Sequence, residues 1–371
     1  TGAPLIANGV VVVGVAGAED SHRGFLEGYD PGTGKHLWRT YNIPGKGEKG
    51  SDTWKADTNL VGGGSSWVTG TYDPELDLVY WGTGNPSPWN PRTREGDALW
   101  TNSIIAFRPK TGERVWAFQT TPADPFDYDG VHTPVRATLN IGGQPRKVVM
   151  QANRGGILYV LDATNGKLLA ANPYGKVTWN DGVDLQTGRP KWTQVYHDAL
   201  AGKNVTVWPS VSGLTNWQHM SFNPQTGLLY INTLHIGMTY EAPEPQAMTP
   251  GKPSGAGSVK RTTVVDDPNV RGYLKAVDAR DGHELYRFKT PSGIVGNVTT
   301  YLHGGKQYVA VLSGAGGNGL GQIFLGAALL AAQLSFANTP SSSPPNNRIV
   351  EEVRRKLVTL PFYSLFDNFT Y

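Results

Sequence analysis

A hydrophobic run, a short polar turn and a second hydrophobic run recur along the chain. The second run often ends in an aromatic residue. A type I turn explains the linker, because Pro or Asp starts such a turn and the following Gly accepts a positive φ. The flanking runs alternate or are rich in β-branched and aromatic residues, which is typical of hairpin strands. The copies that predict these hairpins are YDPGTGKHLW (29–38), FRPKTGERVW (107–116), LDATNGKLLA (161–170), FNPQTGLLYI (222–231) and VDARDGHELY (277–286).

The spacing of these turns predicts the architecture. Their glycines recur at irregular intervals, which is typical of propeller blades with long insertions, whereas a compact solenoid has a stricter period. The expected fold class is therefore all-β, with an incomplete β-propeller of about five to six blades in residues 1–321. An open propeller leaves two blade edges unpaired.

The pattern changes after residue 321. Residues 322–348 hold the uncharged run IFLGAALLAAQLSFA, which is short for a membrane span, and a Pro/Ser linker. Residues 349–371 predict a short helical tail, with one amphipathic helix at about 349–357. Two interpretations stay open. Either the tail is foreign to the propeller, its apolar run resembling a secretory-signal core and its end faintly resembling the start of a BON domain, or the run forms a helix over an exposed propeller edge.

Composition narrows the function classes. The chain has 371 residues, a net charge of +3 and only 17% charged residues, with no basic stripe between aromatics, so we expect no nucleic-acid partner. The absence of cysteine excludes disulfides and thiolate metal sites. The chain starts with Thr1 and no signal peptide precedes it, so we expect a processed or truncated N-terminus.

Hard oxygen ligands follow three strand-like runs. Asn85 lies in WGTGNPSPWN, Asp127 and Asp129 lie in DPFDYDG, and Glu19 ends the stretch VVVGVAGAED. Carboxylate and amide oxygens are the ligands that large cations prefer. Each residue alone also fits an ordinary polar turn. Three loops that each deliver such a ligand nevertheless predict a cation site.

These strings, in this order, resemble the quinoprotein alcohol dehydrogenases, the methanol and ethanol dehydrogenases that use pyrroloquinoline quinone (PQQ). The resemblance runs from residue 1 to about residue 321. It implies an eight-bladed propeller whose first blades and end are missing here. The strings that carry it include GAEDSHRGFLEGYDPGTGKHLWR, GGGSSWVTGTYDPELDLVYWGTGNPSPWN, TTPADPFDYDGVHTP, ANRGGILYVLDATNGK, TNWQHMSFNPQTGLLYI and GKQYVAVLSGAGG.

The resemblance implies a role for each candidate in the metal site. Glu19 and Asn85 would bind the cation, and Asp127 would act both as ligand and as general base for the alcohol hydroxyl. The cation would polarise the quinone carbonyl as a Lewis acid. Asp129 gives the DYD string of the lanthanide-dependent branch. A further anionic ligand suits a trivalent ion, so we expect a lanthanide(III) ion, with Ca²⁺ as the alternative.

The resemblance also implies the cofactor site. Trp67 would form the floor beneath the flat PQQ ring, and Arg154 would stabilise the reduced quinone oxygens as a catalytic residue. The other implied PQQ contacts are Thr1, Ala18, Ser65 and Asn216. In the family a tryptophan docks between neighbouring blades, and Trp38 and Trp116 match it. At the equivalent positions of two other repeats, this chain has Tyr286 and Ala170 in place of the tryptophan. The upstream residues that bind the PQQ carboxylates in the family are missing, which puts PQQ affinity in doubt.

The resemblance thus implies an enzyme that oxidises primary short-chain alcohols, methanol or ethanol, to aldehydes. Electrons would pass to a c-type cytochrome in the periplasm. We expect no membrane span and leave a homodimer open. Alternatives are a non-catalytic envelope β-propeller scaffold, an inactive fragment of the dehydrogenase, or a sugar-oxidising quinoprotein. The scaffold has no reason to keep the metal and cofactor residues together.

Overall fold

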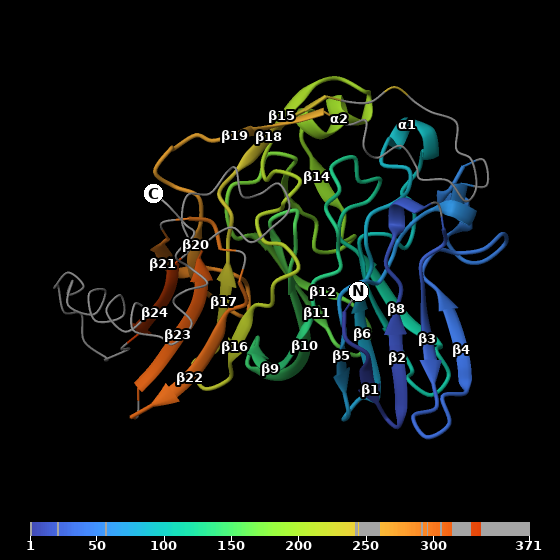
Figure 1. Cartoon of the computed structure of the whole chain (residues 1–371), viewed down its shortest axis with the longest axis horizontal. Helices are drawn as coiled ribbons and strands as arrows, with labels where there is room; N and C mark the ends of the chain where they lie inside the picture. Colours follow the sequence, from blue (N-terminus) through green and yellow to red (C-terminus); the bar gives the residue numbers. More distant parts are fainter. Residues whose placement is uncertain are drawn as a thin grey trace, which may run out of the picture.

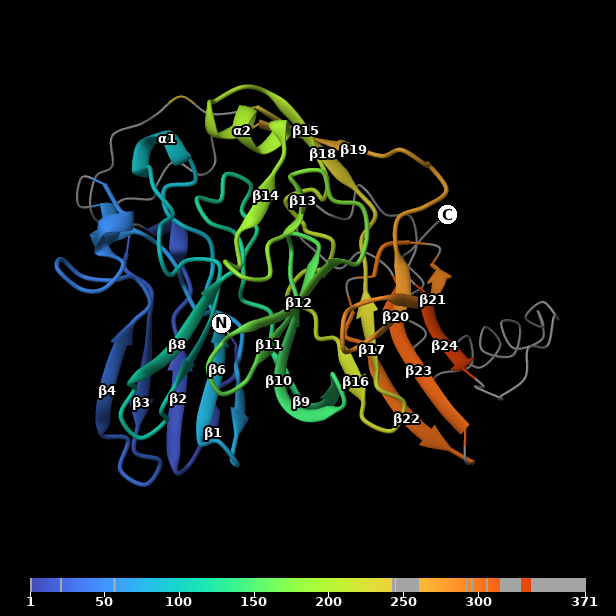
Figure 2. The ribbon, with the colours of Figure 1, turned by 180° about the vertical axis from the view of Figure 1, so that it is seen from behind.

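Five blade-like antiparallel sheets lie side by side and form the body of the molecule (Figures 1 and 2). In the four four-stranded sheets, neighbouring strands follow one another along the chain, apart from an insertion in the fourth. The all-β, propeller-type fold is therefore confirmed. This computed structural model describes residues 2–20, 22–55, 58–241, 244, 260–290, 292–294, 296–304, 306–313 and 328–334.

The strands are short, as the closely spaced turns predict. The first sheet holds β1 (Leu5–Ala7), β2 (Val10–Gly14), β3 (Phe25–Tyr29) and β4 (His36–Tyr41). The second holds β5 (Thr71–Asp73), β6 (Leu78–Gly82), β7 (Ser103–Phe107) and β8 (Arg114–Gln119). The third holds β9 (Val135–Ile141), β10 (Gln144–Ala152), β11 (Ile157–Asp162) and β12 (Leu168–Pro173). The fourth holds β16 (Ser221–Asn223), β17 (Leu228–Asn232), β20 (Tyr273–Asp278) and β21 (Glu284–Lys289), and the fifth β22 (Thr299–His303), β23 (Lys306–Ser313) and β24 (Ala328–Leu334).

The repeated turns occupy two different positions in the sheets. Four of them join the third strand of a sheet to the fourth, whereas the turn of residues 222–231 joins β16 to β17, the first two strands of the fourth sheet. Two copies therefore belong to one sheet. In the second sheet, the glycine at 112 has a φ of 70° and donates its N–H to the carbonyl of Arg108 at 2.8 Å. This is the tight turn that the sequence predicts.

Tryptophan side chains join neighbouring sheets. Trp38 of β4 donates its indole N–H to the carbonyl of Pro109 at 2.9 Å, in the turn of the second sheet. Its ring lies so close to Gly112 that a Cβ there would come within 2.5 Å of it. Trp116 of β8 repeats the contact on the third sheet, with a bond of 3.1 Å to the carbonyl of Ala163. The predicted docking of both tryptophans between blades is confirmed.

The same contact is absent where the sequence departs from the pattern. At the turn of the fourth sheet, Leu158 of β11 takes the place against Gly282, where an added Cβ would lie 3.0 Å from it. Ala170 is buried within the third sheet, and Tyr286 is 39% exposed. The fourth and third sheets are instead joined by aliphatic side chains, including Leu158, Val160, Leu229 and Val277.

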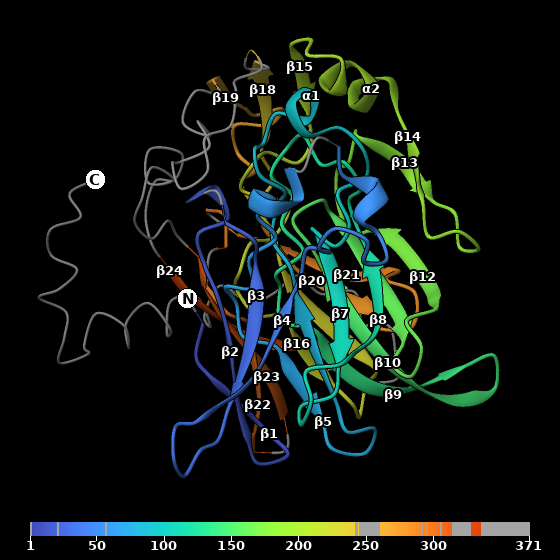
Figure 3. The same ribbon diagram turned by 90° about the vertical axis from the view of Figure 1, so that its right-hand side faces the viewer.

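Insertions between the blade strands gather at one end of the sheets (Figures 1 and 3). They include the helices α1 (Pro91–Arg94) and α2 (Gln194–Leu200) and the hairpin of β13 (Asn180–Val183) with β14 (Pro190–Trp192). A three-stranded sheet at this end has the order β15–β18–β19, with bounds Val205–Val207, Gly237–Glu241 and Lys260–Val264. The candidate site residues lie on loops at this end.

Part of the apolar run after residue 321 is a strand. Residues 328–334 form β24, which pairs antiparallel with β23 from Ser313↔Ala328 to Gln307↔Leu334. The described part of this run is therefore not the helix that one interpretation proposed. The rest of 322–348 and the expected helical tail of 349–371 lie outside the described residues. Among the residues described, no helix is long and apolar enough to cross a membrane.

Candidate functional site

The predicted metal and base residues converge on the loop end of the first three sheets. Glu19 follows β2, Asn85 follows β6 and Arg154 follows β10, so each comes after the second strand of its sheet. Asp127 and Asp129 lie in the connection from β8 to β9. Because second strands of equivalent blades run in the same direction, their following loops meet at one end.

A buried carboxylate shapes the loop that carries Asp127. Asp124 accepts the backbone N–H groups of Phe126 at 2.8 Å and Tyr128 at 2.7 Å. It also accepts the side-chain amide of Asn102 at 2.8 Å. Arg94, which is fully buried, donates to the backbone carbonyl of Asp124. These contacts fold residues 124–128 into a tight turn.

The turn leaves Asp127 in an uncommon conformation. Its φ is 67°, in the left-handed region that non-glycine residues enter infrequently and Asp more readily than most. Asp127 and Asp129 are nevertheless only 9% and 3% exposed. Strained backbone of this kind persists where the surroundings determine it, and it gathers at functional sites. The local conformation therefore aims two carboxylates into one buried region.

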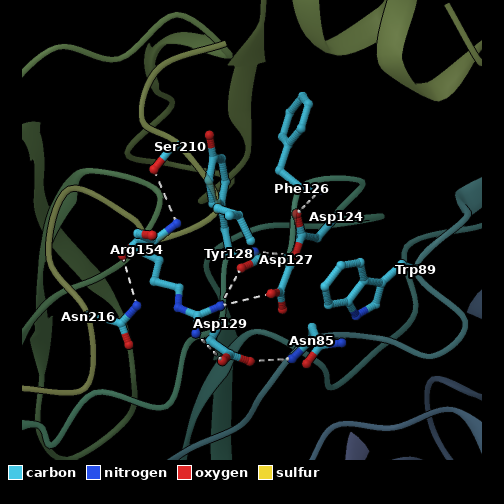
Figure 4. Close-up of polar contacts among 12 residues, drawn as sticks. Asn85, Trp89, Asp124, Phe126, Asp127, Tyr128, Asp129, Arg154, Ser210 and Asn216 are labelled. Carbon is cyan, nitrogen blue, oxygen red and sulfur yellow. Dashed lines mark hydrogen bonds and ion pairs between the residues drawn. The ribbon is translucent and has the colours of Figure 1, made fainter. Parts of the chain in front are cut away.

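Arg154 joins the two carboxylates (Figure 4). Its Nη1 lies 3.1 Å from Oδ2 of Asp127 and also donates to the backbone carbonyl of Asp127 at 2.8 Å. Its Nη2 lies 3.3 Å from Oδ2 of Asp129. Nε of Arg154 is buried without a hydrogen-bond partner among the described residues. One guanidinium therefore bridges the predicted base and the predicted fourth metal ligand.

Asn85 connects this pair to Glu19. The backbone N–H of Asn85 donates to Oδ1 of Asp129 at 2.7 Å, and its side-chain Nδ2 donates to Oε1 of Glu19 at 3.2 Å. The indole N–H of Trp89 reaches the same Glu19 oxygen at 3.3 Å. All four predicted metal residues thus lie in one continuous network. Trp89 forms a wall of this network that the sequence prediction missed.

The network is not a finished metal cage. No three acidic or histidine side chains in the described part of the chain are grouped closely enough to hold an ion as they stand. Arg154 satisfies two of the carboxylates, and the Asn85 amide N–H faces Glu19. A cation would therefore require modest side-chain rearrangement. The donor set fits one, because three carboxylates and an amide oxygen are hard ligands, and a single guanidinium pairs with two of the carboxylates.

Burial dominates the electrostatics of the site. It raises the pKa of Asp127 well above its usual range; Arg154 opposes this shift and Asp129 adds to it. The pKa of Asp129 is raised for the same main reason. Burial alone would lower the pKa of Arg154, but Asp129 and Asp127 outweigh it and raise that pKa. A buried excess of carboxylates thus favours either protonation or a bound cation.

The predicted cofactor residues differ in their contacts. Ser65 is buried, and its carbonyl accepts the N–H of Gly84 at 2.7 Å, next to Asn85. Trp67 is half-buried, and its carbonyl accepts the N–H of Gly2 at 2.5 Å. Ala18 is buried at the start of the 3₁₀ turn that carries Glu19. Thr1 lies outside the described residues.

Asn216 lies on a loop that packs against Arg154 (Figure 4). The loop is attached by the N–H of Leu214, which donates to the carbonyl of Arg154 at 3.0 Å. The Asn216 amide is used inside its own loop: Nδ2 donates to the carbonyl of Ser212 at 2.8 Å and Oδ1 accepts the N–H of Trp217 at 2.9 Å. A cofactor contact from Asn216 would have to replace one of these bonds.

Sequence reasoning missed the residues that support the site. Asp124 begins the DPFDYDG string, and an Asp that opens a turn is a recognisable signal for bonds to following backbone N–H groups. Arg261 of β19 stacks on Trp89, with its guanidinium carbon 4.0 Å from the ring centroid. No local pattern in the sequence pointed to this contact, because β19 belongs to an insertion.

Fold and site together define a propeller-type array of antiparallel sheets with a buried acidic cluster on its loop end. Residues 1–178 match the model of the β-propeller domain of glucose, ethanol and alcohol dehydrogenases that use PQQ. The chain is 38% identical to the quinohemoprotein alcohol dehydrogenase ADH IIB of Pseudomonas putida, over 85% of this chain and 54% of that protein. It is 35% identical to the lanthanide-dependent methanol dehydrogenase of Methylorubrum extorquens, over 83% and 62%.

A solved structure agrees with these matches. A europium-containing methanol dehydrogenase superposes with a TM-score of 0.68 at 31% identity, covering 85% of this chain and 65% of that one. The resemblance to the quinoprotein alcohol dehydrogenases is thereby confirmed, and the chain is a relative of that family. It spans between about half and two thirds of the length of these relatives.

Proposed function

We propose that the whole protein oxidises primary short-chain alcohols, methanol or ethanol, to aldehydes, with PQQ as the two-electron acceptor. The observation that supports this most is the joining of Asp127 and Asp129 by Arg154, beside Asn85 and Glu19, in one buried network. A solvated polar turn would not need three carboxylates and an amide from three separate loops at one place. The family match supports the choice of cofactor.

The metal ion in this proposal is held by Glu19, Asn85, Asp127 and Asp129. Their oxygens offset the charge of a hard cation, and the ion acts as a Lewis acid when bound. We favour a lanthanide(III) ion over Ca²⁺, because Asp129 adds a negative charge to the ligand set. The names of two relatives, a lanthanide-dependent and a europium-containing methanol dehydrogenase, support this choice.

Asp127 is the proposed general base. Its carboxylate takes the hydroxyl proton of the alcohol, and burial, which raises the pKa of Asp127, makes it a stronger base than an exposed carboxylate. Arg154 orients this side chain through the contact of Nη1 with Oδ2 of Asp127 at 3.1 Å. With a metal ion on the carboxylates, the Arg154 guanidinium would be able to donate to the cofactor oxygens.

The cofactor would lie between Trp67 and the Arg154 network. Trp67 offers a flat aromatic surface for stacking, and PQQ supplies the hydride acceptor when bound. The unpartnered Nε of Arg154 is a donor that such a group could use. The remaining proposed contacts are Thr1, Ala18, Ser65 and Asn216.

A c-type cytochrome is the proposed electron acceptor and the periplasm the proposed location. One relative is named as a methanol dehydrogenase subunit with cytochrome c as its partner. A non-catalytic scaffold remains the second candidate, but a scaffold does not require the strained, buried Asp127. A homodimer is a further proposal without a specific contact to support it.

The test is reconstitution of the purified protein with PQQ and lanthanum, calcium or no metal, followed by ethanol and methanol oxidation with an artificial electron acceptor. We expect turnover with lanthanum, less with calcium and none without metal. Asp127→Asn should lower kcat by about 10²- to 10⁴-fold, the usual contribution of a general base. Asp198→Asn, on α2 away from the acidic network, is the control and should retain full activity. Turnover without metal, or in Asp127→Asn at the wild-type rate, would contradict the proposal.

A further inference from the structure

Arg261 brings a positive charge to the site from outside the propeller blades. It lies on β19, an edge strand of the inserted sheet at the loop end of the molecule (Figures 1 and 3). Its guanidinium carbon is 4.0 Å from the ring centroid of Trp89. Trp89 in turn donates to Glu19 at 3.3 Å. The guanidinium therefore covers the wall of the network that holds the proposed base.

The guanidinium of Arg261 lacks the partners that such a group normally has. Its Nε and Nη2 are buried and have no hydrogen-bond partner in the described part of the chain. A buried donor without a partner is costly, and a charged one more so. Burial lowers the pKa of Arg261, and the nearby charge of Asp127 opposes that shift. The structure thus holds a desolvated cation beside the proposed reaction centre.

Two other stacked arginines have a carboxylate partner. Arg39 stacks on Phe25 and is bridged to Glu27 at 2.7 Å. Arg287 lies 5.6 Å from the centroid of Tyr273 and is bridged to Glu284 at 3.4 Å. In each case a carboxylate completes the contacts of the guanidinium. Arg261 has the aromatic ring without the anion.

We propose that Arg261 and Trp89 form an anion subsite, and that the preferred substrates among primary short-chain alcohols are those that carry a carboxylate at their far end. This inference rests on the proposed function. The carboxylate would pair with Nε and Nη2 of Arg261, which places the hydroxyl end toward Asp127. The reaction itself is unchanged: the hydroxyl proton goes to Asp127, the hydride goes to PQQ, and the carboxylate takes no part.

The subsite comes from an insertion, which favours a role in specificity. The proposed metal and base residues lie on loops that belong to the blades, whereas β19 belongs to an inserted sheet and reaches Trp89 through Arg261. The charged side chain of Arg261 on β19 can select substrates without altering the reaction centre. A bidentate pairing between guanidinium and carboxylate is the strongest contact that Arg261 could make.

The first test compares 4-hydroxybutyrate with 1-butanol, which has the same number of carbons and no charge. In the reconstituted wild type we expect a higher kcat/KM for 4-hydroxybutyrate. Arg261→Gln should lower the ratio of the two kcat/KM values by about 10- to 100-fold, since it removes a desolvated charge pair. Arg261→Lys should recover part of the ratio. Arg287→Gln, an arginine that is already bridged, is the matched control and should leave the ratio unchanged.

The second test needs no turnover. Butyrate binding to the protein without PQQ is measured by calorimetry, and we expect Arg261→Gln to weaken it at least about tenfold while Arg287→Gln does not. Equal loss of both substrates together with weaker PQQ binding would overturn the proposal and assign Arg261 to a cofactor carboxylate. Butyrate binding that is absent, or equal in wild type and Arg261→Gln, would also overturn it. If neither alcohol is oxidised but butyrate binds through Arg261, the proposed function fails and the anion subsite stands.

Discussion

Replacement of Asp124 by asparagine tests the physical basis of the site most sharply. The Asp124 carboxylate accepts the N–H groups of Phe126 and Tyr128 and the amide of Asn102, at 2.7–2.8 Å. An asparagine can accept at one oxygen only, and its NH₂ group would face at least one of the three donors. Because the loop also carries Asp127, its conformation should relax away from the left-handed geometry.

These contacts set the expected loss in the free energy of unfolding. Loss of a hydrogen bond to a charged group costs about 1.5–3 kcal/mol, and asparagine loses at least one of the three bonds. Burial raises the pKa of Asp124, so removal of the buried charge offsets part of this loss. We therefore expect Asp124→Asn to lower the free energy of unfolding by about 1.5–3 kcal/mol. That is a large share of the 5–15 kcal/mol typical of a domain.

The change in the free energy of unfolding is measured by urea unfolding, with tryptophan fluorescence as the signal. Asp184→Asn is the matched control, because Asp184 also accepts two backbone N–H groups, of Gln186 and Thr187, at 2.8–2.9 Å. The hydrogen bonds of Asp184 lie at the surface, so water can replace what its mutation removes, and we expect a small effect. If Asp124→Asn is no more destabilising than Asp184→Asn, the organising role assigned to Asp124 is wrong.

Three further single substitutions test blade packing, the pH dependence of stability and the metal site. Trp116→Ala should lower the free energy of unfolding by about 3–5 kcal/mol, because the ring fills the space between two blades; a urea midpoint close to wild type would contradict this. His132 is buried, and burial lowers its pKa to about 3, below its usual 6.5. The folded state therefore binds fewer protons there, so stability is full above about pH 6.5 and is lost as the pH falls toward 3. His132→Gln should flatten that decline in urea unfolding at pH 7 to 4, and an unchanged pH profile would refute the assignment. Gly84→Ala would bring a methyl group within 2.8 Å of the Asp129 carboxylate, so lanthanum affinity should fall at least about tenfold; calorimetry that finds equal affinities would show that Asp129 is not a ligand.

Local chemistry made the hairpins predictable from the sequence. A turn such as 107–116 contains its own Pro and Gly signals, so its structure needs no distant contact. The position of a hairpin in a sheet depends on its partners, which explains why the sequence could not show that 222–231 joins the first two strands of the fourth sheet. The strand at 328–334 was not predicted from the sequence, for a related reason. An Ala- and Leu-rich run fits a helix locally, and only pairing with β23 selects a strand.

The site was predictable to a similar extent. Glu19, Asn85, Asp127 and Asp129 could be found because each ends a strand-like run in a recognisable string, and the structure brings them together. Their roles stay proposals. Arg261 could not be found, because its contact with Trp89 joins an insertion to a distant loop. The Arg154 bridge was missed as a carboxylate contact, since the resemblance directed Arg154 to the cofactor alone.

One titration tests the central claim directly: PQQ is added to the purified protein with lanthanum, with calcium and without metal, while tryptophan fluorescence is followed. We expect PQQ to quench the tryptophan fluorescence tightly when lanthanum is present, and less tightly with calcium. We also expect Asp129→Ala to remove the preference for lanthanum. Equal quenching with all three additions, or no quenching with any of them, would contradict a metal-dependent PQQ site on this chain.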